Sequence, residues 1–155
     1  MPQTTDAVTH SVLVPLAPDA AFELFTTRFG EWWPKDSHHI ADADAADVFL
    51  EPRRDGRWYE RSEDGGECDW GRVLEVDSPN RILLAWQLTP EWKFDPDLGN
   101  ATEVEVLFEA EDDGTRVTLE HRGFEVHGEP GAAMRESVSS EGGWASLLEL
   151  YRRAA

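Results

Sequence analysis

Hydrophobic and polar residues alternate with a period of two through the middle of the chain, from about residue 46 to 122. The alternation is clearest near the end of this region, where Val104, Val106 and Phe108 share one face and glutamates occupy the other. Turn residues such as Asp-Gly and Ser-Pro-Asn separate neighbouring runs. The pattern predicts an antiparallel sheet with one dry and one solvated face. Its strands are expected at 46–54, 56–62, 68–77, 81–88, 102–111 and 115–123.

Two further elements are predicted before this region. Residues 8–14 alternate as a first strand. Residues 16–30 then read as a short helix, in which Phe22, Phe25 and Phe29 form an apolar stripe.

The end of the chain has helical spacing, because Trp144, Leu148 and Tyr151 fall on one face of a helix. We expect a long terminal helix of about 20 residues. Gly142 and Gly143 stand directly before Trp144, although a glycine inside a helix costs about 1 kcal/mol relative to alanine. Either the missing side chains allow the helix to approach a strand or a ligand closely, or the helix begins or kinks at this point.

Length and charge exclude several classes of protein. The 155 residues fit a single domain over 1–155, with about 1–6 as a flexible tail. The formal net charge of −18 repels nucleic-acid phosphates and anionic membranes, so we expect neither as a partner. The acidic surface serves either solubility, including solubility in a salty environment, or the binding of a basic protein.

The single cysteine, Cys68, permits no internal disulfide and indicates a reducing compartment. The N-terminal residues do not resemble a signal peptide, and no apolar run approaches the length of a membrane span. We therefore expect a cytoplasmic protein.

Four stretches resemble the START-related helix-grip (SRPBCC) superfamily and, within it, homologues of the activator of the heat-shock protein 90 ATPase. They are EWW at 31–33, WGRVLEVDSPNRILLAW at 70–86, GTRVTLEHRGF at 114–124 and GGWASLLELYRR at 142–153. The resemblance implies an α+β helix-grip fold, in which about seven antiparallel strands curl around a long C-terminal helix and a short helix follows the first strand. It also implies a cavity between sheet and helix, which relatives use for lipids, sterols or polyketides.

The seven tryptophans are the most unusual feature of the composition. An indole offers a large π-face and one hydrogen-bond donor, which suits an apolar or aromatic ligand with one polar end. Packing of the core is the alternative role for each ring. The residues predicted to bind ligand are Trp32, Trp33, Trp58, Trp70, Trp86, Phe108, His121, Trp144, Leu148 and Tyr151.

His121 and Glu60 are the candidate catalytic residues. His121 continues the apolar face of its strand and Glu60 shares a face with Trp58, so both are expected to point inward. An acid and a base in one apolar site can transfer protons; a purely structural histidine is the alternative. No nucleophile motif is present, and the neighbouring acids Glu67 and Asp69 are expected to raise the pKa of Cys68.

No cofactor and no metal site are expected. His38 and His39 precede several aspartates in 38–47, but the segment has no recognised ligand spacing and reads as a solvated acidic loop. The connection at 89–100 is long enough to act as a lid.

The leading hypothesis is a small binding protein that holds an apolar or aromatic molecule between the sheet and the C-terminal helix. One alternative is an enzyme of the cyclase, aromatase or hydrolase type that uses the same cavity. Another is a protein-interaction module resembling the co-chaperones, and a homodimer is also considered.

Overall fold

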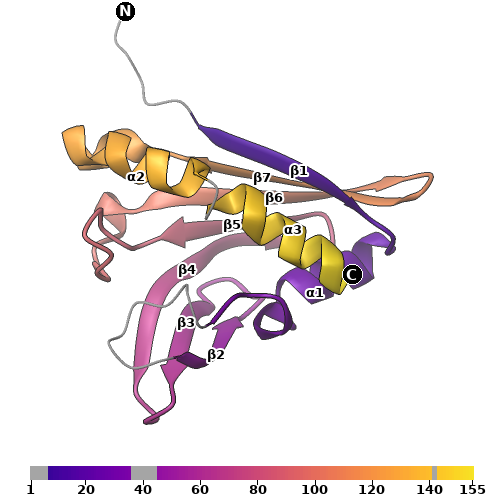
Figure 1. The fold of residues 1–155 in the computed structure, drawn as a ribbon, viewed down its shortest axis with the longest axis horizontal. Coiled ribbons are helices and arrows are strands. Elements are labelled where there is room, and N and C mark those ends of the chain that lie inside the picture. Colours follow the sequence, from indigo (N-terminus) through magenta and orange to yellow (C-terminus); the bar gives the residue numbers. More distant parts are fainter. Residues whose placement is uncertain (1–6, 36–44, 141–142) are drawn as a thin grey trace, which may run out of the picture.

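The computed structural model describes residues 7–35, 45–140 and 143–155, which form an α+β fold (Figure 1). Seven antiparallel strands make one sheet in the order β1-β7-β6-β5-β4-β3-β2. The sheet is a meander from β2 to β7, and β1, the first strand of the chain, pairs with β7 and forms one edge of the sheet. The strands are β1 (Val8–Val14), β2 (Ala45–Leu50), β3 (Arg57–Ser62), β4 (Glu67–Asp77), β5 (Arg81–Trp86), β6 (Thr102–Glu111) and β7 (Gly114–Arg122).

The sheet curls, and the C-terminal helix α3 lies across its concave face (Figure 1). Helix α1 lies beside the C-terminal end of α3, where the Tyr151 hydroxyl donates a hydrogen bond to the Ala21 carbonyl at 2.7 Å. The predicted helix-grip fold class is therefore confirmed. The helices are α1 (Pro18–Phe25), α2 (Glu129–Ser139) and α3 (Trp144–Ala154), with 3₁₀ turns η1 (Phe29–Glu31), η2 (Leu98–Asn100) and η3 (Phe124–His127).

The predicted alternation sets the two faces of the sheet. In β6, Val104, Val106 and Phe108 are buried, while Glu103 and Glu105 lie on the other face. The outer face is crossed by ion pairs: Arg122 contacts Glu105 at 2.9 Å and Glu103 at 3.2 Å. The concave face thus carries the apolar core and the convex face carries most of the charge.

One register irregularity lies between β3 and β4. Trp58 pairs with Gly71 and Tyr59 with Asp69, so Trp70 is the extra residue of a bulge on β4. Alternation along β3 places Trp58 and Glu60 on the inner face, where both are buried. Tyr59 is buried as well, because Phe49 (ring centroids 4.9 Å apart) and the Arg57 guanidinium cover its ring.

The expectation of one terminal helix of about 20 residues is wrong, because the segment is divided into two helices of 11 residues each. Helix α2 ends at Ser139, α3 begins at Trp144, and Gly143 is the N-cap residue of α3. A Cβ atom on Gly143 would lie 2.0 Å from the Val138 carbonyl oxygen and 3.0 Å from the Val138 Cα. Gly143 therefore marks the start of a helix that packs tightly against the end of α2, which is the second of the two explanations for the glycines. Gly142 lies outside the described residues.

Replacing Gly143 by alanine is expected to destabilise the protein, because the backbone of α2 or α3 must move to admit the methyl group. We expect G143A to lower the free energy of unfolding by about 2 kcal/mol. Gly66 offers a matched control, since the nearest atom to its added Cβ is the Asp64 side-chain oxygen at 3.2 Å. Urea titration of both variants measures the effect, and the free energy of unfolding of G66A should stay within about 0.5 kcal/mol of the wild-type value. Equal losses in the two variants would contradict the packing at the junction.

Some predictions fall on residues that are not described. The tail at 1–6 and most of the acidic segment, including His38 and His39, lie outside the described ranges. Asp47 is described and belongs to β2, where its Oδ1 accepts a hydrogen bond from the Val48 amide at 2.9 Å. Among the described helices, none is long and apolar enough to cross a membrane.

Candidate functional site

Five tryptophans form a closed circuit of ring contacts in the core, which we call the tryptophan circuit. They come from five segments: the turn after η1 (Trp33), β3 (Trp58), β4 (Trp70), β5 (Trp86) and the first residue of α3 (Trp144). Consecutive ring centroids around the circuit are separated by 5.2 to 6.2 Å, in the order 33, 70, 58, 86, 144 and back to 33. All five rings are at most 5% exposed. Most pairs are edge-to-face or tilted, the geometry that aromatic quadrupoles prefer.

Gly71 allows two of these rings to meet across an intervening strand. In the sheet register Trp58 of β3 lies opposite Gly71 of β4, and Gly71 lies opposite Trp86 of β5. A Cβ on Gly71 would lie 3.4 Å from the Trp58 ring and 1.9 Å from the Ala85 carbonyl oxygen. Without a side chain on β4, the indoles of Trp58 and Trp86 reach a centroid distance of 5.6 Å. Sequence reasoning missed Gly71, because its role depends on strand register.

The indole N–H groups in the core have different partners. Trp70 donates to Glu60 Oε1 at 2.7 Å, and Trp144 donates to His121 Nδ1 at 3.0 Å. Outside the circuit, Trp32 donates to the Leu24 carbonyl at 3.0 Å. By contrast, the Nε1 atoms of Trp58 and Trp86 are buried and have no hydrogen-bond partner in the described parts of the protein.

His121 is buried at the end of β7 and both of its ring nitrogens are engaged. Nδ1 accepts from Trp144, and Nε2 lies 2.8 Å from the Thr102 hydroxyl oxygen. Because an indole only donates, Nδ1 must be unprotonated and Nε2 carries the proton of the neutral ring. Burial, assisted by the nearby His127, lowers the pKa of His121 to about 3. The predicted inward orientation is confirmed, and the contacts describe a neutral histidine that ties β7 to β6 and α3.

Glu60 is also fully buried, as its predicted face requires. Its Oε1 accepts the Trp70 indole hydrogen bond, which fixes the carboxyl group beside the tryptophan circuit. His121 reaches the circuit through Trp144 and Trp86, whose ring lies 5.0 Å from the imidazole. The two candidate catalytic residues therefore touch different members of the circuit, and their catalytic role stays a prediction.

The remaining predicted ligand-binding residues lie in a second cluster, beside α1. Phe108 contacts Phe22 and Phe25, with centroids 5.3 and 6.0 Å apart. Trp32 and Tyr151 pack against each other at 5.3 Å, and both also contact Phe25. Burial raises the pKa of the Tyr151 hydroxyl. This second cluster joins the tryptophan circuit through Phe29, while Leu148 is fully buried on α3.

The circuit approaches the surface at Trp92, in the connection between β5 and β6. The Trp92 ring is 39% exposed and contacts Trp86 edge-to-face at 6.3 Å. Trp92 also has a φ of 62°, an uncommon conformation for a bulky residue. The other exposed large hydrophobic residues of the described chain, Leu98 and Val126, lie in this connection and in the adjacent η3. The predicted lid thus has its apolar side chains at one end of the circuit.

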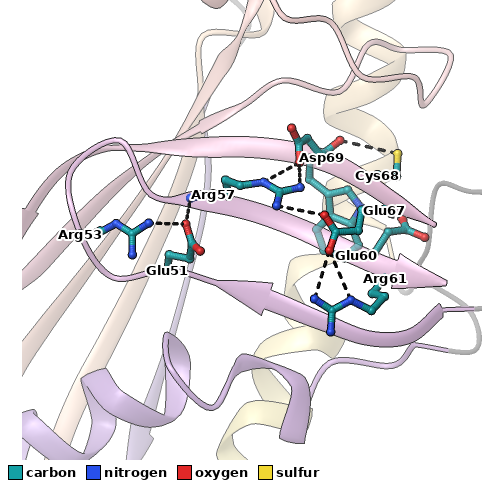
Figure 2. Close-up of polar contacts among 9 residues, drawn as sticks. Glu51, Arg53, Arg57, Glu60, Arg61, Glu67, Cys68 and Asp69 are labelled. Atoms are coloured by element: carbon teal, nitrogen blue, oxygen red, sulfur yellow. Dashed lines mark hydrogen bonds and ion pairs between the residues drawn. The ribbon is translucent and has the colours of Figure 1, made fainter. Parts of the chain in front are cut away.

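The exposed side of β3 and β4 has a different chemistry. Arg57 contacts Asp69 at 2.6 Å and Glu67 at 3.1 Å, and Arg61 also pairs with Glu67 (Figure 2). The pKa of Cys68 is raised, first by burial and then by the nearby Glu60 and Asp69. The predicted direction is correct, but burial is the largest cause, and Glu60 acts beside Asp69 where Glu67 was expected. A raised pKa does not activate the thiol.

Two contacts of His121 were missing from the sequence-based predictions. Thr102 continues the inward face of β6, two positions before Val104, which pairs with His121. That alternation could have identified Thr102. Phe124, 4.6 Å from the imidazole, belongs to η3 and follows a left-handed Gly123, so no periodic signal points to it.

A curled seven-stranded sheet that grips a C-terminal helix, with an aromatic site between them, defines a protein of the SRPBCC helix-grip type. The chain belongs to the Activator of Hsp90 ATPase homolog 1-like (AHSA1) family, whose model matches residues 15–150. No curated protein sequence matches the chain.

Solved structures give more specific likenesses. The chain is similar to Txn09, an anthrahydroquino-gamma-pyrone synthase, with 34% identity, full coverage of both chains and a TM-score of 0.68. It is also similar to CalC of Micromonospora echinospora, a self-sacrificing resistance protein, with 32% identity, coverage of 97% and 94%, and a TM-score of 0.70. The Aha1 dimer of Colwellia psychrerythraea has 16% identity, coverage of 96% and 95%, and a TM-score of 0.61, which shows the fold alone.

Proposed function

We propose that the protein binds a flat, polycyclic aromatic molecule at the tryptophan circuit, between the concave face of the sheet and α3. The observation that carries the proposal is the circuit itself: five buried indoles from five segments, two of which have N–H groups without a hydrogen-bond partner among the described residues. A set of packing residues needs no unpaired donors, whereas a ligand site holds polar groups that its ligand completes. Trp92 and the exposed apolar residues near it provide the side from which a hydrophobic molecule enters.

The relatives support this proposal. Txn09 is a synthase whose printed name contains a fused aromatic pyrone, and its 34% identity extends over the whole chain. CalC is a resistance protein of the same fold with a similar identity. The two printed activities differ, so a common fold does not decide the activity, and the proposal takes from the relatives only the aromatic small-molecule chemistry in the name of Txn09.

Titration with pyrene, a neutral polycyclic aromatic, tests the proposal. We expect saturable quenching of tryptophan fluorescence with a dissociation constant on the order of micromolar. Pyrenetetrasulfonate is the matched control, since it keeps the ring frame but carries negative charge. The net charge of −18 should weaken its binding at least about 10-fold at low salt. The absence of saturable quenching by pyrene would refute the proposal.

The second candidate function is an enzyme acting on the bound molecule, and Txn09 is the observation that favours it. Glu60 is the better candidate for proton transfer, because the pKa of His121 is lowered to about 3 by burial, which makes its neutral ring a weak base. A fused polyaromatic ketone incubated with the protein and recovered with an altered mass would support an enzyme, and loss of that change in E60Q would assign the role. Recovery of the compound unchanged supports a binding protein.

The other predictions concern partners and location. The protein-interaction alternative and the homodimer stay predictions, and light scattering on the purified chain tests the dimer. A cytoplasmic location also stays a prediction.

A further inference from the structure

We infer that Trp58 and Trp86 act as paired hydrogen-bond donors that select ligands carrying acceptor oxygens, such as an aromatic ketone or quinone, over hydrocarbons of the same shape. This inference rests on the proposed function and specifies the chemistry of the ligand. It assigns to the two indoles the role of specificity-determining residues.

The first support is the contrast between indoles in the same core. Three of them, Trp32, Trp70 and Trp144, donate to an acceptor of the protein at 2.7 to 3.0 Å. Trp58 is fully buried and Trp86 is 5% exposed, yet neither Nε1 has an acceptor among the described residues. Leaving a buried donor unpaired is costly, so each such group in a native structure calls for an explanation.

The two rings also touch each other, and this contact does not satisfy the donors. Their planes are inclined by 73° at a centroid distance of 5.6 Å, which is an edge-to-face contact. An N–H directed at a π-face is a weak, second-order interaction compared with a hydrogen bond to oxygen. A carbonyl oxygen has two lone pairs, so it can accept a stronger hydrogen bond from the N–H of either indole.

The chemistry of the partner follows from what an indole can do. Nε1–H donates and never accepts, so a complementary ligand atom must be an acceptor. The nearby polar groups do not reverse this preference. The neutral His121 uses Nδ1 and Nε2 for Trp144 and Thr102, and Glu60 Oε1 accepts from Trp70.

The position of the pair is fixed by the sheet. Trp58 and Trp86 lie on β3 and β5 and meet above Gly71 of β4, so the donors are held on rigid strands and not on loops. Trp86 is also the member of the circuit that contacts the exposed Trp92. The pair therefore includes the ring of the circuit that contacts the partly exposed Trp92.

A comparison of 9-fluorenone with fluorene tests the inference, because the two compounds share a tricyclic frame and differ by one carbonyl oxygen. Wild type should bind fluorenone about 10-fold more tightly than fluorene, the value of one added hydrogen bond. W58F and W86F each keep a ring but lose one N–H, so the ratio of affinities should fall in each. It should reach about 1 in the W58F/W86F double variant.

Y59F provides the matched control, since it removes a hydroxyl from β3 directly beside Trp58 and keeps the ring that packs against Phe49 and Arg57, outside the tryptophan circuit. Its ratio should equal that of wild type. If a core variant does not fold, the wild-type protein still gives a result: in a ¹H–¹⁵N spectrum, two indole N–H proton signals should move further downfield with saturating fluorenone than with saturating fluorene, because only fluorenone can accept their hydrogen bonds.

Each outcome separates the two proposals. Equal affinities of wild type for the two compounds, or a preference that survives in the double variant, would overturn the inference and leave the binding function intact. If neither compound binds, the proposed function fails and the inference fails with it.

Discussion

Acidification from pH 6.5 to pH 5 is expected to lower the free energy of unfolding by about 2 kcal/mol through His121 alone. The imidazole is fully buried and its pKa is lowered to about 3, mainly by burial. In the unfolded chain the same group titrates near its ordinary value of 6.5. Below pH 6.5 the unfolded state therefore binds a proton that the folded state does not. The stability is fully present above pH 6.5 and is lost progressively as the pH falls toward 3.

Urea unfolding at several pH values measures this effect. H121Q isolates the contribution of the histidine, because the unfolding free energy of this variant should change less steeply with pH than that of wild type. A slope equal to the wild-type slope would contradict the assignment. NMR of the imidazole nitrogens gives an independent readout: Nε2 should stay protonated and Nδ1 unprotonated at pH 5, and a charged ring at that pH would contradict the buried neutral state.

Replacing Trp144 by alanine is expected to cost about 4 kcal/mol of stability, a large part of the 5–15 kcal/mol typical of a small domain. The side chain is 1% exposed and its ring contacts Trp33, Trp86 and His121. Its removal creates a cavity at the start of α3 and leaves His121 Nδ1 buried without a donor.

W144F separates these two contributions. Phenylalanine keeps most of the packing but lacks the N–H, so we expect a loss of about 2 kcal/mol. The same change should raise the pKa of His121, because Nδ1 becomes free to bind a proton. Arg153 on the same helix is the control: its side chain is 70% exposed and 3.7 Å from Glu149, so R153A should change stability by less than about 0.5 kcal/mol. A loss below about 1 kcal/mol in W144A would show that the ring is not packed as described.

The sheet could be predicted from the sequence because its signal is local. The period of two in β6 and β7 identifies which side chains face inward, and it correctly placed His121 in the interior. Glu60 was also placed correctly, while Tyr59 is buried although it is not on the inner face, because Phe49 and Arg57 cover its ring. Local patterns therefore predict the face on which a side chain lies, but not how far its neighbours cover it.

The arrangement of the site could not be predicted in the same way. Whether Trp58 meets Trp86 depends on the registers of two strand pairs and on the absence of a side chain at Gly71. Similarly, the sequence shows an aromatic stripe that includes Trp144, but the partner of its N–H lies on β7, far away in the chain. The predicted set of ligand-binding residues consequently covered two adjoining clusters of one core, one around Trp86 and one around Phe25, without distinguishing them.

The pairing of β1 with β7 has a consequence for synthesis on the ribosome. Of the seven strands β1 is made first, yet its partner follows roughly a hundred residues later, which takes on the order of 10 s at ordinary translation rates. During that interval β2 to β6 can pair one after another, while β1 remains an open edge prone to wrong pairing. Helix α3, which contacts β1 and contributes Trp144, emerges later still. The tryptophan circuit is thus closed only after translation of α3, so a nascent chain lacks the complete circuit at which we propose that a ligand binds.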